Sequence, residues 1–265
     1  MTVSWSAYRR ARRRSRQAWT LLALAAVSVV AGLLWFFTAG QFAAAEPTAA
    51  GPSEAPVFDP AWMKPVVAVN HIPEGRALDA LELLAVKGRA GKDNYHREAF
   101  GQAWLDVDRN GCDTRNDILR RDLAGVVFTE GSNCGIAAGR FHEPYTAQHV
   151  DFRRGSESSR AVQIDHVVAL ADAWQKGAQH LTPSQRQSLA NDPLNLIAAD
   201  GPANQQKGAA DAATWLPKNK TIRCHYVARQ ISVKAAYSLW VTEAEKDAMR
   251  RVLGSCPDQQ TVMAR

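Results

Sequence analysis

Residues 161–207 constrain the fold of this chain most, because they carry Asp165 beside His166 and then Asn195 and Asn204. An isolated Asp-His pair indicates little, since neighbouring side chains on a regular strand point to opposite faces. Where a strand ends or bulges, however, both side chains can reach one site, with the carboxylate holding a hard cation and the imidazole taking a proton from water. The pair and the two spaced Asn residues together predict such a shared site.

This arrangement resembles the HNH, or His-Me finger, endonucleases, whose ββα-metal motif is a hairpin followed by a helix around one divalent ion. The resemblance implies an α+β fold, with a ββα-metal core, surrounding helices and an antiparallel hairpin or meander. It also implies that His166 is the general base and that Asp165 and Asn204 are metal ligands. Asn195 would hold the loop and orient the base, and Lys207, one helical turn beyond Asn204, would meet a phosphate of the substrate.

A wider set of phrases extends the resemblance beyond this stretch. They are Phe-Gly-Gln-Ala-Trp at 100–104, Asn-Gly-Cys-Asp-Thr-Arg-Asn-Asp at 110–117, Asp-His-Val-Val at 165–168, Ala-Trp-Gln-Lys-Gly-Ala at 173–178 and Trp-Leu-Pro at 215–217. Through these phrases, residues 95–256 resemble exported HNH family proteins related to the C-terminal nuclease domain of GmrSD-type restriction enzymes. One position departs from the frequent Asp-His-x-x-Pro pattern, where this chain has Ala169. The missing Pro affects backbone stiffness and removes no ligand.

Hydrophobic periodicity and turn residues predict the elements around the motif. Residues 125–152 are strand-like, and we expect an antiparallel hairpin or meander there, ahead of the site. Residues 192–197 are expected as the second strand of the motif. Helices are expected around residues 78–85 and at residues 167–176, 183–189, 203–210, 218–240 and 243–253.

The basic character of the chain is concentrated at its amino terminus. Of the 32 Lys and Arg residues, six Arg lie in residues 1–45, which hold no acidic residue, so 26 basic and 26 acidic residues remain in the body. The net charge of +6 is therefore no argument for nucleic-acid binding by the body, and any phosphate-binding surface must be local. Arg153 and Arg160, close before Asp165, are the best candidates, with a solvated loop as the alternative.

Residues 1–45 have the pattern of an export segment. An Arg-rich start precedes an apolar run at residues 19–37, and the three Ala residues before Glu46 predict cleavage after Ala45. The run also approaches the ~20 residues that cross a bilayer, so retention as a single-pass membrane anchor is equally open. Either way, the positive-inside rule places the rest of the chain outside the cytoplasmic membrane, extracellular or at the cell surface. Residues 46–60 form a Pro- and Ala-rich linker, and residues 61–265 are expected as the nuclease domain.

Four cysteines, all beyond the apolar run, predict two disulfides formed in an oxidising compartment. Four cysteines allow three pairings, and we favour the sequence-local pairs Cys112–Cys134 and Cys224–Cys256, because each closes a loop within one subregion. A structural zinc site is the rival interpretation, although the chain has no Cys-x-x-Cys spacing.

A second metal site is suggested by the run from Asp106 to Asp117. Asp106, Asp108, Asn110 and Asp117 stand at positions 1, 3, 5 and 12, and Gly111 stands at position 6, as in calcium-binding loops. Position 12 is usually the longer Glu, and Asp and Asn beside Gly also form ordinary turns. Ca²⁺ binding and a simple turn both remain open.

These observations lead to one functional expectation with one alternative. The expectation is an exported, monomeric, metal-dependent HNH endonuclease that hydrolyses phosphodiester bonds of DNA, or of RNA, with Mg²⁺ favoured over Mn²⁺ and Zn²⁺. No helix-turn-helix or zinc finger is recognisable, so little sequence specificity is expected. The alternative is a membrane- or wall-associated calcium-binding protein with an inactive nuclease fold.

Overall fold

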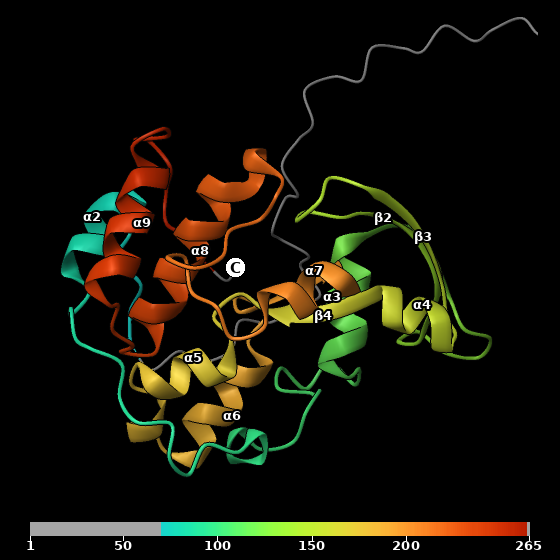
Figure 1. Cartoon of the computed structure of the whole chain (residues 1–265). Helices are drawn as coiled ribbons and strands as arrows, with labels where there is room; N and C mark the ends of the chain where they lie inside the picture. The colour runs from blue at the N-terminus through green and yellow to red at the C-terminus, as the bar shows by residue number, and fades with distance from the viewer. Residues whose placement is uncertain (1–69, 264–265) are drawn as a thin grey trace, which may run out of the picture. The chain divides into compact units, whose positions relative to one another are not determined.

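The computed structural model describes residues 70–263, except the side chains of Ser156, Glu157 and Ser159, and these residues belong to one compact unit, Pro56–Arg265 (Figure 1). The predicted export segment, the cleavage after Ala45 and the linker at residues 46–60 lie outside the described residues. Within residues 70–263, no helix is long and apolar enough to cross a membrane.

The fold is α+β, as predicted, and a three-stranded antiparallel sheet confirms the meander expected at residues 125–152. Its strands follow one another in the order β1 (Leu123–Phe128), β2 (Ile136–His142) and β3 (His149–Arg153). Helix α3 (Thr114–Asp122) leads directly into β1 and packs on β2. The helix begins at Asp113, whose carboxylate accepts the backbone N–H of Asn116.

A separate two-stranded antiparallel sheet is followed directly by a helix. These elements are β4 (Val162–His166), β5 (Leu196–Asp200) and α7 (Gly201–Lys207), and the short helix α4 (Ser156–Ala161) precedes β4. Gly201 has no room for a side chain, because a Cβ there would lie 2.1 Å from the carbonyl oxygen of Arg160. This close approach of two backbones holds the start of α7 against the end of α4, beside the first residue of β4.

The strand β5 begins four residues later than the sequence predicts. Residues 192–197 were expected to be extended, but Asp192 to Asn195 form a turn in which the Asn195 N–H donates to the Asp192 carbonyl at 2.8 Å. The Asp192 carboxylate also accepts the N–H of Leu194 at 2.8 Å. Because this side chain stabilises a turn, pairing with β4 starts only at Leu196.

Two α-helices and a short 3-10 helix connect β4 to β5. They are α5 (Leu170–Gln175), η2 (Ala178–His180) and α6 (Pro183–Asn191). Helix α6 begins at Thr182, which forms a reciprocal capping box with Gln185 and therefore explains why the sequence locates this helix well. Helix α5 starts later than the predicted residue 167, because Ala169 keeps an extended backbone.

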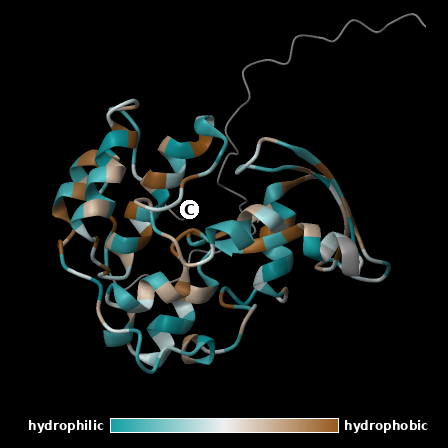
Figure 2. Ribbon diagram, in the orientation of Figure 1, coloured by the Kyte–Doolittle hydropathy of each residue, from teal (hydrophilic) through white to brown (hydrophobic). Residues whose placement is uncertain are grey.

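The carboxy-terminal helices pack with the first described helix. The elements are α2 (Ala77–Leu83), η3 (Lys220–Ile222), α8 (Arg223–Ala236) and α9 (Glu243–Leu253), while η1 (Arg97–Phe100) lies beside α6. Figure 1 shows α2, α8 and α9 side by side, and Figure 2 shows apolar and polar residues alternating around them. Helix α8 begins later than the predicted residue 218, because Asn219 instead caps η3. The disulfide Cys224–Cys256 joins the start of α8 to the segment after α9, with the predicted pairing.

The β4–β5 hairpin lies between two apolar clusters. The smaller cluster holds buried residues of α3 and the three-stranded sheet together with Val162 and Ile164 of β4. The larger cluster holds buried residues of α2, α5, α8 and α9 together with Ile197 and Ala199 of β5. Alternate residues of a strand point to opposite faces, so each strand of the hairpin can contact one apolar cluster with one face. Its opposite face is available for polar groups or for contact with the other cluster.

A buried ion cluster joins the helices around the larger apolar cluster. The Lys176 ammonium lies 2.8 Å from Asp172, 2.8 Å from Asp211 and 2.6 Å from Glu245, and the Lys176 side chain is fully buried. Removing one partner from such a cluster typically costs ~3–5 kcal/mol, because a buried charge is left uncompensated. The cluster therefore supports the position of α5 and α9.

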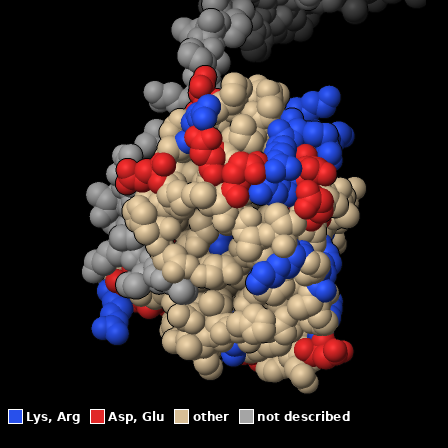
Figure 3. All heavy atoms as spheres, turned by 90° about the vertical axis from the view of Figure 1, so that its left-hand side faces the viewer, with Lys and Arg blue, Asp and Glu red and all other residues tan. Residues whose placement is uncertain are grey.

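Exposed charges on the side of α2 and α9 are of both signs. Glu82 pairs with Arg250 at 2.8 Å and with Lys246 at 3.1 Å. Figure 3 shows acidic and basic residues interspersed on this face. On the face shown, the folded chain therefore presents no broad basic surface, in agreement with the neutral charge balance of residues 46–265.

Candidate active site

The four motif residues lie on the β4–β5–α7 unit, but β4 separates two of them. Asp165 and His166 pair with Ile197 and Leu196 in an uninterrupted antiparallel register, without a bulge. Their side chains therefore point to opposite faces of the strand, and the structure does not bring them to one point. His166 faces a pocket, whereas Asp165 faces α7.

His166 is held in a neutral form with one ring nitrogen committed. Its Nε2 lies 2.9 Å from the carbonyl oxygen of Ala190, and because a carbonyl can only accept, Nε2 carries the hydrogen. Burial is the main cause that lowers the pKa of His166 to about 4, and the positive charge of Arg97 lowers it further. Among residues 70–263, Nδ1 has no hydrogen-bond partner, so its lone pair is available to accept a proton.

His166 lines a pocket of about 280 Å³ between η1, the loop after it, α5 and α6. The other lining residues include Arg97, Gln102, Trp104, Leu170 and Ala190. Arg97 and Glu98, which also lines the pocket, are exposed and Trp104 is half-buried, so the pocket offers a cation, an anion and an aromatic side chain beside the histidine. Arg97 is not predicted from the sequence, because no local pattern relates it to His166, which lies 69 positions later. Its only signal is its place just before the Phe-Gly-Gln-Ala-Trp phrase.

Asn195 fixes the backbone around His166. Its Oδ1 accepts the N–H of Val168 at 2.9 Å, and its Nδ2 donates to the carbonyl oxygens of Val168 and Leu189 at 3.3 and 3.2 Å. Leu189 directly precedes Ala190, whose carbonyl holds the His166 ring. One fully buried amide therefore joins the residues after β4 to the end of α6, and positions the acceptor of the histidine.

Asp165 and Lys207 form a buried ion pair. The Asp165 Oδ1 accepts from the Lys207 ammonium at 3.0 Å, and its Oδ2 accepts from the Tyr145 hydroxyl at 2.6 Å. The same ammonium donates to the carbonyl of His166 at 2.8 Å, and the Lys207 side chain is 0% exposed. The folded chain therefore buries and pairs the charge of Lys207, so a contact between Lys207 and a phosphate requires this pair to open and stays a prediction.

The residues around Asp165 do not fit the predicted divalent ion as they are arranged. Both Asp165 oxygens are occupied, and an ammonium already lies against the carboxylate. Asn204 lies one helical turn before Lys207 on α7, and its Nδ2 donates to the Gln163 side chain at 2.9 Å. Across residues 70–263, no three His, Cys, Asp or Glu side chains group in a way that could hold a metal ion. We therefore assign no chemical step to a metal.

The two predicted phosphate-binding arginines lie elsewhere. Arg153 ends β3 and Arg160 lies in the last turn of α4, both exposed, and neither lines the His166 pocket. His166 is four residues beyond the start of β4, which corresponds to ~13 Å along a strand. Arg160 therefore lies near the end of β4 that is far from His166. The arginine near His166 is Arg97, and not the Arg153 or Arg160 predicted from the sequence.

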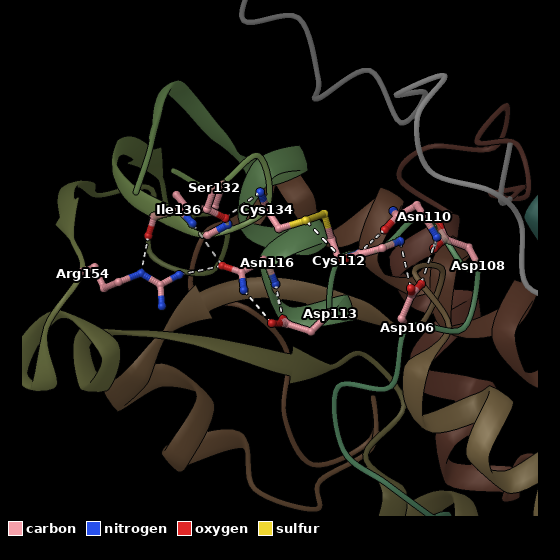
Figure 4. The surroundings of a disulfide bond; sticks show 12 residues. Asp106, Asp108, Asn110, Cys112, Asp113, Asn116, Ser132, Cys134, Ile136 and Arg154 are labelled. Atoms are coloured by element: carbon pink, nitrogen blue, oxygen red, sulfur yellow. Dashed lines mark hydrogen bonds between the residues drawn. A yellow bond between two sulfur atoms is a disulfide. The ribbon is translucent and has the colours of Figure 1, made fainter. Parts of the chain in front are cut away.

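The loop proposed for calcium is closed by its own backbone. The Asp106 carboxylate accepts the N–H groups of Asn110 and Gly111 at 3.1 and 2.9 Å, and Asp108 also accepts from Asn110 (Figure 4). Gly111 has a φ of +91°, which favours glycine. Asp117 is buried, and its Oδ1 has no hydrogen-bond partner among the described residues. The turn is thus present, while Ca²⁺ binding stays a prediction.

The predicted disulfide Cys112–Cys134 stands beside this loop. It joins the residue before Asp113 to the turn that precedes β2, and both sulfurs are drawn in Figure 4. The side chain of Asn116, in the first turn of α3, accepts the N–H of Ile136 at 3.1 Å and the Arg154 guanidinium at 2.7 Å. The bond and these contacts hold α3 against the three-stranded sheet.

Comparison with known proteins gives the family of this α+β domain. Residues 113–252, more than half of the chain, match the family described as GmrSD restriction endonucleases, C-terminal domain. The chain belongs to this nuclease-related family. It is also 37% identical over 195 residues to an uncharacterized secreted protein of Arthroderma benhamiae, covering 72% of this chain and 91% of that protein. No solved structure matches the chain.

Proposed function

We propose that this chain is an exported endonuclease that hydrolyses phosphodiester bonds of nucleic acid, with His166 as the general base. The observation that carries the proposal is the neutral His166 itself, whose Nε2 is bound to Ala190 and which lines a pocket with Arg97. Family membership supports a nucleic acid as the substrate. DNA is the proposed substrate, and RNA is the alternative.

The proposed reaction uses the free ring nitrogen and one arginine. Nδ1 of His166 removes a proton from a water molecule, and the water oxygen attacks phosphorus. The bond from phosphorus to the leaving sugar oxygen breaks, and that oxygen is protonated from solvent. The Arg97 guanidinium offers hydrogen bonds to the phosphoryl oxygens as negative charge builds on them. Trp104 provides a ring on which a base or sugar can rest without regard to sequence, which agrees with low specificity.

Asn195 is proposed as a positioning residue for this base. It contacts the backbone of Val168, two residues after His166, and of Leu189, next to the Ala190 acceptor, and it does not line the pocket. Its loss should reduce turnover by loosening the Ala190 acceptor while leaving Arg97 in place. The proposed role differs from a purely structural one, because it predicts a change in the pH dependence of turnover in Asn195→Ala.

The order strand, strand, helix supports the HNH interpretation, with His166 as the last residue of the first strand. The Mg²⁺ ion that the resemblance implies remains a prediction, with Mn²⁺ and Zn²⁺ as the rivals, since binding it at Asp165 and Asn204 requires the Lys207 pair to open. Activity in the presence of a chelator, compared with activity after adding back each ion, tests this point.

Export is part of the proposal. All four cysteines are paired in disulfides, which persist in oxidising compartments. The relative from Arthroderma benhamiae is described as secreted. We propose an extracellular or surface location, reached through residues 1–45 with cleavage after Ala45 or with residues 19–37 retained as an anchor. The amino-terminal sequence of the protein from its host tests which form exists.

The central experiment compares two histidine variants on plasmid DNA. His166→Gln should lower the cleavage rate by ~10²–10⁴, the usual contribution of a positioned base. His225→Gln is the matched control, because burial also lowers the pKa of His225 to about 4, but His225 does not line the pocket. Equal loss in both variants, at equal melting temperatures, would assign the effect to something other than the base.

A further inference from the structure

Two histidines face each other on the three-stranded sheet, 24 and 17 residues before the proposed base in the sequence. Strands β2 and β3 lie side by side (Figure 1), and His142 of β2 and His149 of β3 are direct partners in their antiparallel register and are both exposed. Their ring centroids lie 4.6 Å apart, and their Nδ1 atoms lie 3.4 Å apart. Neither histidine lines the His166 pocket.

The spacing of the two nitrogens suits a shared ion better than a direct hydrogen bond. An N–H donor normally lies about 2.9–3.0 Å from its acceptor. Zinc binds imidazole nitrogens at about 2.0–2.1 Å in tetrahedral geometry, which sets two such nitrogens about 3.3–3.4 Å apart. We propose that His142 and His149 together bind one divalent transition-metal ion of the zinc class, with water filling its remaining positions.

The surroundings of the pair favour this class of ion. The next partners on the same face are Arg140 and Asp151, which are of opposite charge and therefore leave no net charge against a cation. Imidazole ligands select Zn²⁺, Ni²⁺ and Cu²⁺ over Ca²⁺ and Mg²⁺, which prefer oxygen. All four cysteines are in disulfides, so no thiolate competes for the ion.

The ion would close the loop that supports the other face of β4. His142 is the last residue of β2 and His149 is the first residue of β3, on either side of the loop at residues 143–148. Within that loop the buried Glu143 carboxylate accepts the N–H groups of Tyr145 and Thr146, and Tyr145 donates to Asp165. Binding at the two histidines therefore stabilises the loop that carries Tyr145 and, through it, the strand that carries His166.

Zinc titration of the full chain tests the site, with Zn²⁺ alone as the probe. We expect the wild type to bind one Zn²⁺ by calorimetry and to melt several degrees higher with it, since a ligand that binds the folded state stabilises it. His149→Gln and His142→Gln should each weaken the affinity at least tenfold and abolish the rise in melting temperature. His71→Gln, which changes another exposed histidine, is the matched control and should behave as the wild type.

The outcomes separate this site from the proposed catalytic one. Melting temperatures measured in a chelator show whether the variants fold. If one single variant does not fold, the other single variant alone tests the site. Zinc binding that survives in the double variant His142→Gln/His149→Gln, or no saturable binding by the wild type, would overturn the proposal. Because the pair is outside the His166 pocket, zinc binding can be lost while DNA cleavage persists. DNA cleavage can likewise be lost while zinc binding persists.

Discussion

Replacing Lys207 by Met tests the largest difference between the sequence expectation and the folded site. The substitution keeps an unbranched apolar stem and removes the ammonium. It deletes the hydrogen bonds of 3.0 Å to Asp165 and 2.8 Å to the His166 carbonyl. The Asp165 carboxylate then remains buried, with the Tyr145 hydroxyl as its other hydrogen-bond partner.

The expected cost follows from this burial. Both side chains are nearly inaccessible, at 0% and 6% exposed, so solvent cannot replace the lost partner. Breaking one side of a buried pair typically costs ~3–5 kcal/mol. For a domain of this size, each kcal/mol lowers the melting temperature by ~2–4 °C. We therefore expect Lys207→Met to melt roughly 6–20 °C below the wild type.

The assay is thermal unfolding by circular dichroism, with four proteins in a double-mutant cycle. Asp165→Asn removes the charge that Lys207 neutralises, so the double variant should be less destabilised than the sum of the two single variants, by ~0.5–3 kcal/mol. Nucleic-acid binding is measured on the same proteins. If Lys207→Met melts with the wild type but loses nucleic-acid binding, the buried-pair argument is refuted and the phosphate contact predicted from the sequence is restored.

Four further predictions concern the pH dependence of cleavage, the pH dependence of stability, calcium binding and one disulfide. The depressed pKa of His166, about 4, keeps the base neutral in mild acid, so cleavage should persist as pH falls to about 5 and be lost near 4, which a pH–rate profile checks. An unfolded histidine takes up its proton near pH 6.5, so His166 also makes stability fall as pH drops from about 6.5 toward 4, and His166→Gln should flatten that limb of an unfolding curve. If the loop from Asp106 to Asp117 binds Ca²⁺, the ion should raise the melting temperature of the wild type but not that of Asp117→Asn. Equal changes in melting temperature for the two proteins would mean that the loop is only a turn. Replacing Cys224 and Cys256 by Ser opens a link across 32 residues and should cost ~2–4 kcal/mol in urea unfolding.

Local patterns account for the elements that the sequence located well. Thr182 and Gln185 form a capping box, and Thr242 caps α9, so both helices begin where short-range hydrogen bonds start them. The meander follows from strand-like runs broken by turn residues, and the two disulfides have the sequence-local pairing that the analysis favoured among the three possible ones. Side chains a few residues apart decide where α6 and α9 begin, which is why the sequence alone indicates these helix starts.

The site depended on contacts that no local pattern contains. Whether Asp165 and His166 share a site turns on whether β4 is regular at its end, and pairing with β5 makes it regular. Lys207 became a buried partner because α7 packs against that strand, and Arg97 entered the pocket because η1 packs on α6. The chain itself determined which residues carry chemistry. Only the packing of segments distant in the sequence decided which of them meet, because a side chain's direction and its solvent access are properties of the assembled elements.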